Sequence, residues 1–377
     1  MAGLYIHIPF CKSKCAYCDF FSVATFQRKE EFVKSLGNEI ELQTNYLEGE
    51  ILKTIYFGGG TPSVLSIKEI EEILSQIKKH HIIDIDTEIT FEANPDDLSY
   101  DYLLQLKQTG INRLSIGVQS FIDRDLQLMK RRHNAKKAKD VIYDAQKAGF
   151  KNISVDLIYG LPAMTIRDWS SNLDQLLELN IQHISAYHLT IEPNTFFSKW
   201  YKQNLIKLPT DIESVKQFEL LIKKTKKKGF IHYEISNFAI DGYFSKHNTN
   251  YWRNEKYLGI GPSAHSYNLS SRQWNISNIP KYLDAINKRK VPYEGEILTQ
   301  NDRYNDYIIT SLRTMWGIRL NKVENDFGKL YFNFLKREID PLVNNKLLKK
   351  VNDSFVLTKK GKFLSDRIIT TLLYVKK

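Results

Sequence analysis

The amino-acid sequence predicts an α/β protein: a partial (β/α)6 barrel of the TIM type, followed by a helical, winged-helix-like C-terminal domain. Short apolar runs typical of strands occur in the first half, at residues 4–8, 54–57, 88–92, 113–118, 153–158 and 183–189. Several segments between them repeat apolar residues at three- and four-residue spacing, which indicates amphipathic helices; one such set is Ile70, Ile73, Leu74 and Ile77. Strands separated by helices form parallel βαβ units, and six units in a row suit an open barrel with its chemistry at the carboxyl ends of the strands.

The remaining elements follow in chain order. We expect helices at 31–47, 67–79, 136–148 and 166–179, then a lysine-rich helix at 212–228 and a strand at 231–235. Residues 237–267 are rich in aromatic residues and glycine, and we expect loops there. From about residue 277 the chain is mostly helical and basic. This organisation predicts three parts: the barrel at 1–235, an aromatic, loop-rich segment at 236–276, and the winged-helix-like domain at 277–377.

Composition limits the class of protein. With 377 residues, 42% of them hydrophobic, the chain has enough apolar material for a packed core, which excludes disorder. All three cysteines lie between positions 11 and 18, so a disulfide framework is excluded and a reduced, cytoplasmic setting is expected. The sequence shows neither an export signal nor a run of about 18 apolar residues that could cross a membrane. Residues 1–200 sum to −4 and residues 201–377 to +15.

The cysteines form a C-x3-C-x2-C motif, Cys11, Cys15 and Cys18, directly after the first predicted strand. Three thiolates on one short loop can converge on one metal centre, and soft thiolates select zinc or iron–sulfur clusters. A structural zinc site normally has four ligands, and His7 on the preceding strand is poorly placed to be the fourth. A four-iron cluster held by three cysteines leaves one iron open to another ligand. Zinc and three incidental thiols are the alternatives.

The stretch from Tyr5 to Phe20 resembles the opening of radical S-adenosylmethionine (SAM) proteins, in particular the group that contains oxygen-independent coproporphyrinogen III dehydrogenase and HemW. The resemblance implies that the three cysteines hold a 4Fe-4S cluster whose open iron binds SAM. It also implies a reductant, such as flavodoxin or ferredoxin, that supplies the electron for SAM cleavage. Tyr17 resembles the aromatic residue beside the adenine, and Tyr5 resembles the first-strand tyrosine near the cofactor.

A glycine motif, Tyr56-Phe-Gly-Gly-Gly-Thr-Pro62, ends the second predicted strand. It has neither the spacing of a dinucleotide fingerprint nor that of a P-loop, and taken alone it is also typical of a strand-to-helix turn. It resembles the family's methionine-binding motif. The resemblance implies that Gly59 contacts the cluster-bound SAM, while Gly60 and Thr61 contact a second SAM found in the dehydrogenase.

Later strand ends carry polar residues at family positions. Glu92 resembles the carboxylate that accepts the ribose hydroxyls of the first SAM. Gln119, Arg131 and Asp156 resemble residues at the second SAM. Taken singly, Glu92 or Asp156 could be a helix N-cap or an ion-pair partner. Polar residues that recur at or just past successive strand ends favour one shared site.

Two departures from the dehydrogenase pattern indicate the subtype. Phe20 stands where the dehydrogenases usually have a fourth cysteine. In addition, His247-Asn-Thr-Asn-Tyr251-Trp252 matches the H-N-x-x-Y-W motif typical of HemW. The resemblance therefore implies a heme chaperone that delivers heme to acceptor proteins, such as respiratory enzymes of the membrane, without coproporphyrinogen dehydrogenase activity.

The same motif suggests how heme is held. The His247 imidazole is a standard type of axial ligand, and Tyr251 and Trp252 could pack on the macrocycle. The surplus of Lys and Arg favours the heme propionates. Alternatively, His247 only shapes the pocket, because a histidine before asparagine is often a capped turn. Other possible iron ligands are His133, His188 and His265. A homodimer would help to shield the cluster or heme.

Two other functions compete with heme delivery. The first is the dehydrogenase reaction itself, oxidative decarboxylation of porphyrinogen propionates. The second is nucleic-acid modification, because the second half is basic and ends in a winged-helix-like unit. The lysines of that half lie in predicted helices, where a charge run is typical of a solvated face, so we expect no nucleic-acid partner.

Overall fold

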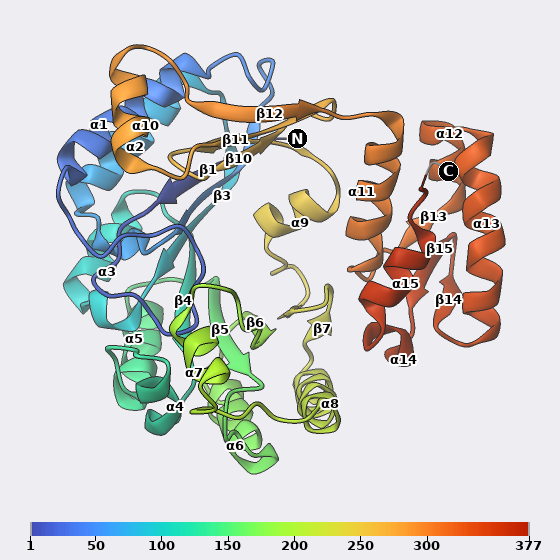
Figure 1. The fold of residues 1–377 in the computed structure, drawn as a ribbon. Helices are drawn as coiled ribbons and strands as arrows, with labels where there is room; N and C mark the ends of the chain where they lie inside the picture. The colour runs from blue at the N-terminus through green and yellow to red at the C-terminus, as the bar shows by residue number, and fades with distance from the viewer. Residues whose placement is uncertain (1, 376–377) are drawn as a thin grey trace.

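The computed structural model describes residues 2–375 and is organised around a large twisted sheet (Figure 1). Six parallel strands lie side by side in chain order: β1 (Ala2–Ile8), β2 (Leu52–Gly59), β3 (Ile83–Ala93), β4 (Arg113–Gln119), β5 (Ile153–Tyr159) and β6 (His183–His188). Every neighbouring pair among them is parallel. The predicted partial (β/α)6 barrel is confirmed.

Helices connect these strands and cover the outer face of the sheet (Figure 1). They are α1 (Lys29–Leu42), α2 (Ile67–His80), α3 (Tyr100–Gln108), α4 (Asp123–Leu128), α5 (Ala135–Lys147) and α6 (Ile166–Leu177); α7 (Phe196–Lys202) and α8 (Asp211–Lys227) follow β6. In α2 the predicted apolar face is buried, and a capping box of Ser66 and Glu69 begins the helix. No helix within residues 2–375 is both long and apolar enough to cross a membrane.

The segment expected to be loops contains regular structure. It holds β8 (Asn237–Ala239), α9 (Lys246–Trp252), β9 (Lys256–Ile260) and β10 (His265–Tyr267); β11 (Ser271–Asn275) and β12 (Tyr293–Ile297) follow. The predicted strand at 231–235 is reduced to β7 (Ile231–His232). Strand β9 pairs in parallel with β1, with Leu258 opposite Leu4. The loop prediction was wrong because these short strands are stabilised by a distant partner rather than by a local pattern.

The chain ends in a second, smaller core. Its elements are α11 (Gln300–Leu312), β13 (Ile318–Arg319), α12 (Leu320–Phe327), α13 (Lys329–Asn344), β14 (Leu348–Val351), β15 (Ser354–Leu357), α14 (Lys359–Lys362) and α15 (Ser365–Leu372). Mostly helical, with a three-stranded sheet β13-β15-β14, this unit agrees with the predicted winged-helix-like domain. Helix α10 (Ile279–Asn287) instead packs on α1, within the core of the barrel. The predicted boundary at residue 277 stays a prediction.

One buried carboxylate joins the barrel to this returning chain. Glu39 on α1 is 0% exposed. It accepts hydrogen bonds from Gln43 Nε2 (3.0 Å), the Gly261 amide (2.7 Å), Asn275 Nδ2 (2.6 Å) and Tyr282 Oη (2.5 Å). Burial raises the pKa of Glu39, while the four donors favour its ionised form. Glu39 therefore fixes three parts of the returning chain against the first helix: the residue just after β9, strand β11 and helix α10.

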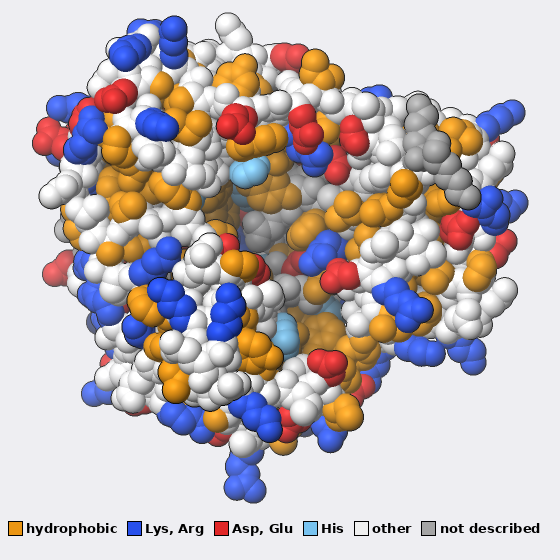
Figure 2. All heavy atoms as spheres, viewed as in Figure 1, with side chains coloured by type: hydrophobic (Ala, Val, Ile, Leu, Met, Phe, Trp, Pro, Cys, Tyr) orange, Lys and Arg blue, Asp and Glu red, His pale blue; other side chains and the backbone are white. Residues whose placement is uncertain are grey.

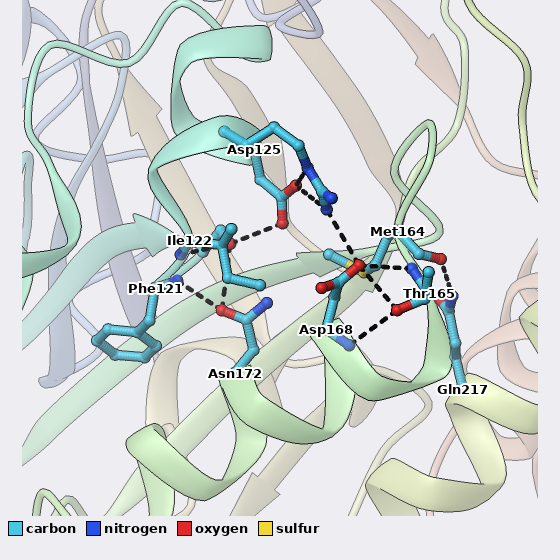
Figure 3. Close-up of polar contacts among 10 residues, drawn as sticks. Phe121, Ile122, Asp125, Met164, Thr165, Asp168, Asn172 and Gln217 are labelled. Carbon is cyan, nitrogen blue, oxygen red and sulfur yellow. Dashed lines mark hydrogen bonds and ion pairs between the residues drawn. The ribbon is translucent and has the colours of Figure 1, made fainter.

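The loops at the carboxyl ends of β4 and β5 are held by buried amide side chains (Figure 3). Asn172 on α6 accepts a hydrogen bond from the Phe121 amide, just beyond β4. Gln217 on α8 donates one to the Met164 carbonyl (3.1 Å) in the loop after β5. They hold the loops that follow Gln119, which ends β4 with a positive φ of 69°, and Tyr159, which ends β5.

Candidate functional site

A cavity of about 370 Å³ opens at the carboxyl ends of the barrel strands. We call it the cysteine cavity, because the C-x3-C-x2-C loop forms one wall. It brings together all the predicted cluster and SAM residues except Tyr5: Cys11, Cys15, Tyr17, Cys18, Gly59, Gly60, Thr61, Glu92, Gln119, Arg131 and Asp156. These residues come from the loop after β1, from strands β2 to β5, and from the segments that follow β2 and β4. The gathering of strand residues from consecutive units agrees with the barrel geometry.

Two hydrogen bonds reach the cysteine sulfurs, one from a residue just after β2 and one from the segment between α4 and α5. Thr61 Oγ1 donates to Cys11 Sγ (3.2 Å), and Arg131 Nη1 donates to Cys15 Sγ (3.4 Å). Burial raises the pKa of the Cys11 thiol, and it raises that of Cys18 to about 11. Iron bound to the sulfurs would reverse this tendency, because a metal ligand must be a thiolate.

A group held by all three sulfurs fits this cavity. Within residues 2–375, no three or more His, Cys, Asp and Glu side chains are gathered as ligands of a single metal ion. The three thiols instead share one cavity wall, and the donors from Thr61 and Arg131 suit the sulfurs of an anionic cluster.

The glycine motif brings the end of β2 against β1. A Cβ atom on Gly59 would lie 2.7 Å from the His7 ring, and Gly59 has a φ of +106°. A Cβ atom on Gly60 would lie 2.8 Å from the Ile8 carbonyl oxygen. Neither position can carry a side chain without displacing β1, so the backbone itself is presented to the cavity.

Two half-buried carboxylates, Glu92 and Asp156, line the cavity and interact through their charges. Burial raises the pKa of Glu92 to about 7, although Tyr56 Oη donates a hydrogen bond (2.7 Å) that favours the ionised form. Burial raises the pKa of Asp156 to about 6, and Ser115 Oγ donates to it (3.3 Å). Both lie within strands β3 and β5, so neither is a helix N-cap.

Asn94 is a site residue that the sequence analysis missed. Its Nδ2 donates to Thr61 Oγ1 (3.2 Å), and its Oδ1 accepts from Arg131 Nη2 (2.6 Å). It thereby connects the residues that donate to Cys11 and Cys15. Its place in Phe-Glu-Ala-Asn-Pro, two residues after Glu92 at the end of β3, could have identified it.

A second cavity, of about 550 Å³, lies between the barrel and the C-terminal domain, where Figure 2 shows a hollow with hydrophobic side chains around it. We call it the aromatic cavity. Its lining residues include Tyr5, Phe20, Phe21, Tyr251, Trp252, Tyr257 and Tyr267. Phe20, which is 70% exposed, lines both cavities. Tyr5 thus borders the aromatic cavity rather than the cysteine cavity.

His247 lies behind the wall of the aromatic cavity. It is 1% exposed, and its Nδ1 and Nε2 atoms form hydrogen bonds with Thr54 Oγ1 and Tyr251 Oη, both of 2.8 Å. Burial lowers the pKa of His247 to about 3, so the ring is neutral, with one nitrogen a donor and the other an acceptor. Tyr251 and Trp252 line the cavity, whereas the His247 imidazole supports Tyr251 from behind.

The other predicted histidines are dispersed. His133 is buried and its Nε2 bonds to the Val118 carbonyl (3.0 Å). His188 lines the cysteine cavity, where its Nε2 contacts Ser214 Oγ (3.1 Å). His265 lines the aromatic cavity.

Known proteins resemble this chain over its whole length. A model of the radical SAM superfamily matches residues 5–176, and a model of the HemN C-terminal domain matches residues 298–364. The heme chaperone HemW of Lactococcus lactis subsp. lactis is 36% identical over 370 residues, covering 98% of this chain and 96% of the relative. HemW of Bacillus subtilis is 34% identical, covering 99% of both chains. The solved structure of coproporphyrinogen III oxidase (HemN) from Escherichia coli superposes with a TM-score of 0.86 at 24% identity, over 99% of this chain and 90% of that chain, and supports the fold.

Proposed function

Because this chain belongs to the HemW family of the radical SAM superfamily, we propose that it is a heme chaperone: it holds a 4Fe-4S cluster and SAM in the cysteine cavity, binds heme in the aromatic cavity, and delivers heme to acceptor proteins. One observation carries the proposal. The two cavities adjoin at Phe20, and the Tyr and Trp of the H-N-x-x-Y-W motif line the one that the cysteines do not.

In the cysteine cavity, Cys11, Cys15 and Cys18 would hold the cluster. When bound, the cluster supplies one electron to SAM, delivered to it by a small redox protein of the cytoplasm such as flavodoxin or ferredoxin. Glu92 would accept the ribose hydroxyls of SAM, and the Gly59 backbone would lie against its methionine part.

The remaining residues of the cysteine cavity would position these groups. Arg131, held by the Gly117 carbonyl (2.7 Å) and Asn94, directs its guanidinium at Cys15. Tyr17 would lie beside the adenine. Gly60, Thr61, Gln119 and Asp156 line the same cavity, where a second SAM would contact them.

In the aromatic cavity, Tyr251, Trp252 and Tyr257 would lie against the faces or edge of the macrocycle. His247 would orient Tyr251 through the 2.8 Å hydrogen bond rather than bind the iron, since both of its ring nitrogens are engaged. The cavity borders α11 through Asp306, Ile309 and Thr310, so heme would contact both domains. An acceptor protein could then reach heme at the surface between them.

The test is anaerobic reconstitution with iron and sulfide, followed by titration with heme. We expect both groups to bind to one chain, and a labelled heme to pass to an apo-hemoprotein of the respiratory chain. A chain that takes up the cluster but shows no saturable heme binding would contradict the proposal.

The reconstituted protein should also be incubated with SAM, a reductant and coproporphyrinogen III. We expect no decarboxylated product, because the protein belongs with the HemW relatives and carries Phe20 in place of the fourth cysteine. Formation of protoporphyrinogen IX would favour the dehydrogenase reaction instead.

A further inference from the structure

We propose that His265 is the axial ligand of the heme iron in the aromatic cavity, and that Arg272 binds a heme propionate there. This inference rests on the proposed heme binding and adds the residues that determine how heme is held. It follows from comparing every histidine near the cavity by what its ring nitrogens already contact.

Two histidines line the aromatic cavity, His7 and His265. His7 is 4% exposed, its Nε2 bonds to the Phe21 carbonyl (2.9 Å), and its Nδ1 lies 3.2 Å from Tyr5 Oη. His247, which supports the lining residue Tyr251, is engaged at both nitrogens as well. An iron ligand needs a free nitrogen lone pair, so neither ring is available without breaking buried hydrogen bonds.

His265 differs on each of these points. It begins β10, is exposed, and lines the cavity. Among the described residues, neither nitrogen of its ring has a hydrogen-bond partner. Its ring lies tilted beside that of Trp274, with the two centroids 6.1 Å apart. Partial burial, and then the charge of Arg272, lower the pKa of His265, so the imidazole is neutral and can donate a lone pair.

The backbone holds this histidine rigidly. His265 pairs with Trp274 across the antiparallel β10–β11 ladder, and the Glu39 network fixes the adjoining chain through Gly261 and Asn275. A ligand on a strand supported in this way has a defined direction, which favours axial coordination over incidental contact.

The charged residues of the cavity suit an anionic porphyrin edge. Arg272 is the one cationic side chain among the described lining residues. It lies on β11, pairs with Glu296 (2.9 Å) and Asp306 (3.3 Å), and keeps 37% of its side chain exposed. A guanidinium has five N–H donors and can bind a carboxylate with two of them. Arg272 can therefore donate hydrogen bonds to a propionate, either as a further partner or in place of Asp306.

Aromatic side chains form much of the rest of the wall. Tyr251, Tyr257 and Tyr267 pack against one another edge-on or tilted, with ring centroids 4.6 and 6.0 Å apart in successive pairs. Such a wall gives a flat apolar ligand a large contact area at a small cost in side-chain entropy. The cavity therefore combines a free imidazole, one cation and an aromatic surface, which together match the iron, propionates and macrocycle of heme.

The test uses the full chain, loaded with cluster, and follows heme binding by its visible spectrum and by electron paramagnetic resonance. We expect His265→Ala to change the axial-ligand signature and to weaken heme binding about tenfold or more. Loss of a residue that only supports a metal ligand already lowers metal affinity by about that factor. Added free imidazole should restore the wild-type signature, because it can enter the space left by the side chain. A purely structural role would not give this rescue.

Two comparison variants complete the design. His81→Ala removes another histidine with an unpaired Nε2, at the end of α2 and outside both cavities, and should leave the heme spectrum unchanged. His247→Ala should weaken binding by releasing Tyr251, without a signature that imidazole restores. If His265→Ala binds heme with the wild-type spectrum, or if only His247→Ala is rescued by imidazole, the assignment of His265 is overturned. A wild-type chain that binds no heme would instead contradict the proposed function.

Arg272 is tested with a second probe, heme whose propionates are esterified. We expect Arg272→Gln to weaken binding of heme about tenfold or more, and binding of the diester far less, because a charge-assisted hydrogen bond needs the free carboxylate. Equal weakening of both ligands would overturn the propionate role. Circular dichroism melting of each variant identifies any that fail to fold.

Discussion

The cysteine cavity and the aromatic cavity lie next to each other but are assembled in different ways. The cysteine cavity collects residues that leave consecutive parallel strands at one edge of the sheet, from Cys11 to Asp156. The aromatic cavity collects β1, the end of the cysteine loop, α9, β9 to β11 and α11. The first cavity is thus a product of a repeated local unit, whereas the second exists only because the chain returns to β1. They should respond differently to the loss of local and of long-range contacts.

The largest effect is expected from Cys15→Ala. Removing one of three thiolates should abolish the reconstituted cluster altogether, because no other Cys exists in the chain to replace it. Heme binding should survive, since Cys15 does not line the aromatic cavity. Iron and sulfide analysis, with heme titration of the same sample, checks both. Simultaneous loss of heme would show that the two cavities are coupled.

Glu39→Ala should affect the chain that forms the aromatic cavity. It leaves the Gly261 amide, Asn275 and Tyr282 without their buried acceptor, which should lower the free energy of unfolding by about 3 kcal/mol or more. The structure of the aromatic cavity should change more than that of the cysteine cavity, because this network holds the chain around β10 and β11.

Urea unfolding measures the effect of Glu39→Ala, and Glu41→Ala is the matched control on the same helix. Glu41 forms an exposed ion pair with Arg289 (2.8 Å), worth at most about 1 kcal/mol. Equal losses from the two variants would contradict the importance of the buried network.

Glu92→Gln should weaken SAM binding about tenfold or more, the usual value of a hydrogen bond to a charged group. Because burial raises the pKa of Glu92 to about 7, the wild-type carboxylate is protonated below that pH and ionised above it. SAM affinity should therefore rise between pH 6 and 8 in the wild type and stay flatter in Glu92→Gln.

Other groups act on this carboxylate: Tyr56 by its hydrogen bond, and Asp156 and Arg113 by their charge. The pKa of Asp156 is raised to about 6, so its own titration falls at the lower end of the range. Equilibrium dialysis of labelled SAM with cluster-loaded protein, at constant ionic strength, gives the profile. A wild-type affinity independent of pH would contradict the role of Glu92.

The smallest effect is expected from Lys359→Ala. Lys359 on α14 pairs with Glu219 on α8 (2.7 Å), a contact between the two domains, but the side chains are 63% and 43% exposed. Its removal should change the free energy of unfolding by less than about 1 kcal/mol. A larger change in urea unfolding would show that surface charge, rather than buried contacts, holds the domains together.

Much of the cysteine cavity could be predicted from the sequence. The spacing of apolar residues predicts helices such as α2. Consecutive βαβ units place the carboxyl ends of their strands on the same side of the sheet, in chain order. The six predicted strands therefore also predict that residues such as Thr61, Glu92 and Asp156 lie close together. Asn94 could have been predicted in the same way, because it directly follows β3.

Only the tertiary structure decided the aromatic cavity and the state of His247. Strand β9 is short and contains a glycine, so nothing local reveals that it pairs with β1, some 250 residues earlier in the chain. The availability of an imidazole is also not a property of its motif: it depends on what its two nitrogens contact. Thr54 and Tyr251 contact those of His247, whereas those of His265, a residue that lines the cavity, have no hydrogen-bond partner among the described residues. The sequence by itself determined the barrel and its cysteine loop, because local periodicity encodes them; long-range packing determined which histidine faces the second cavity.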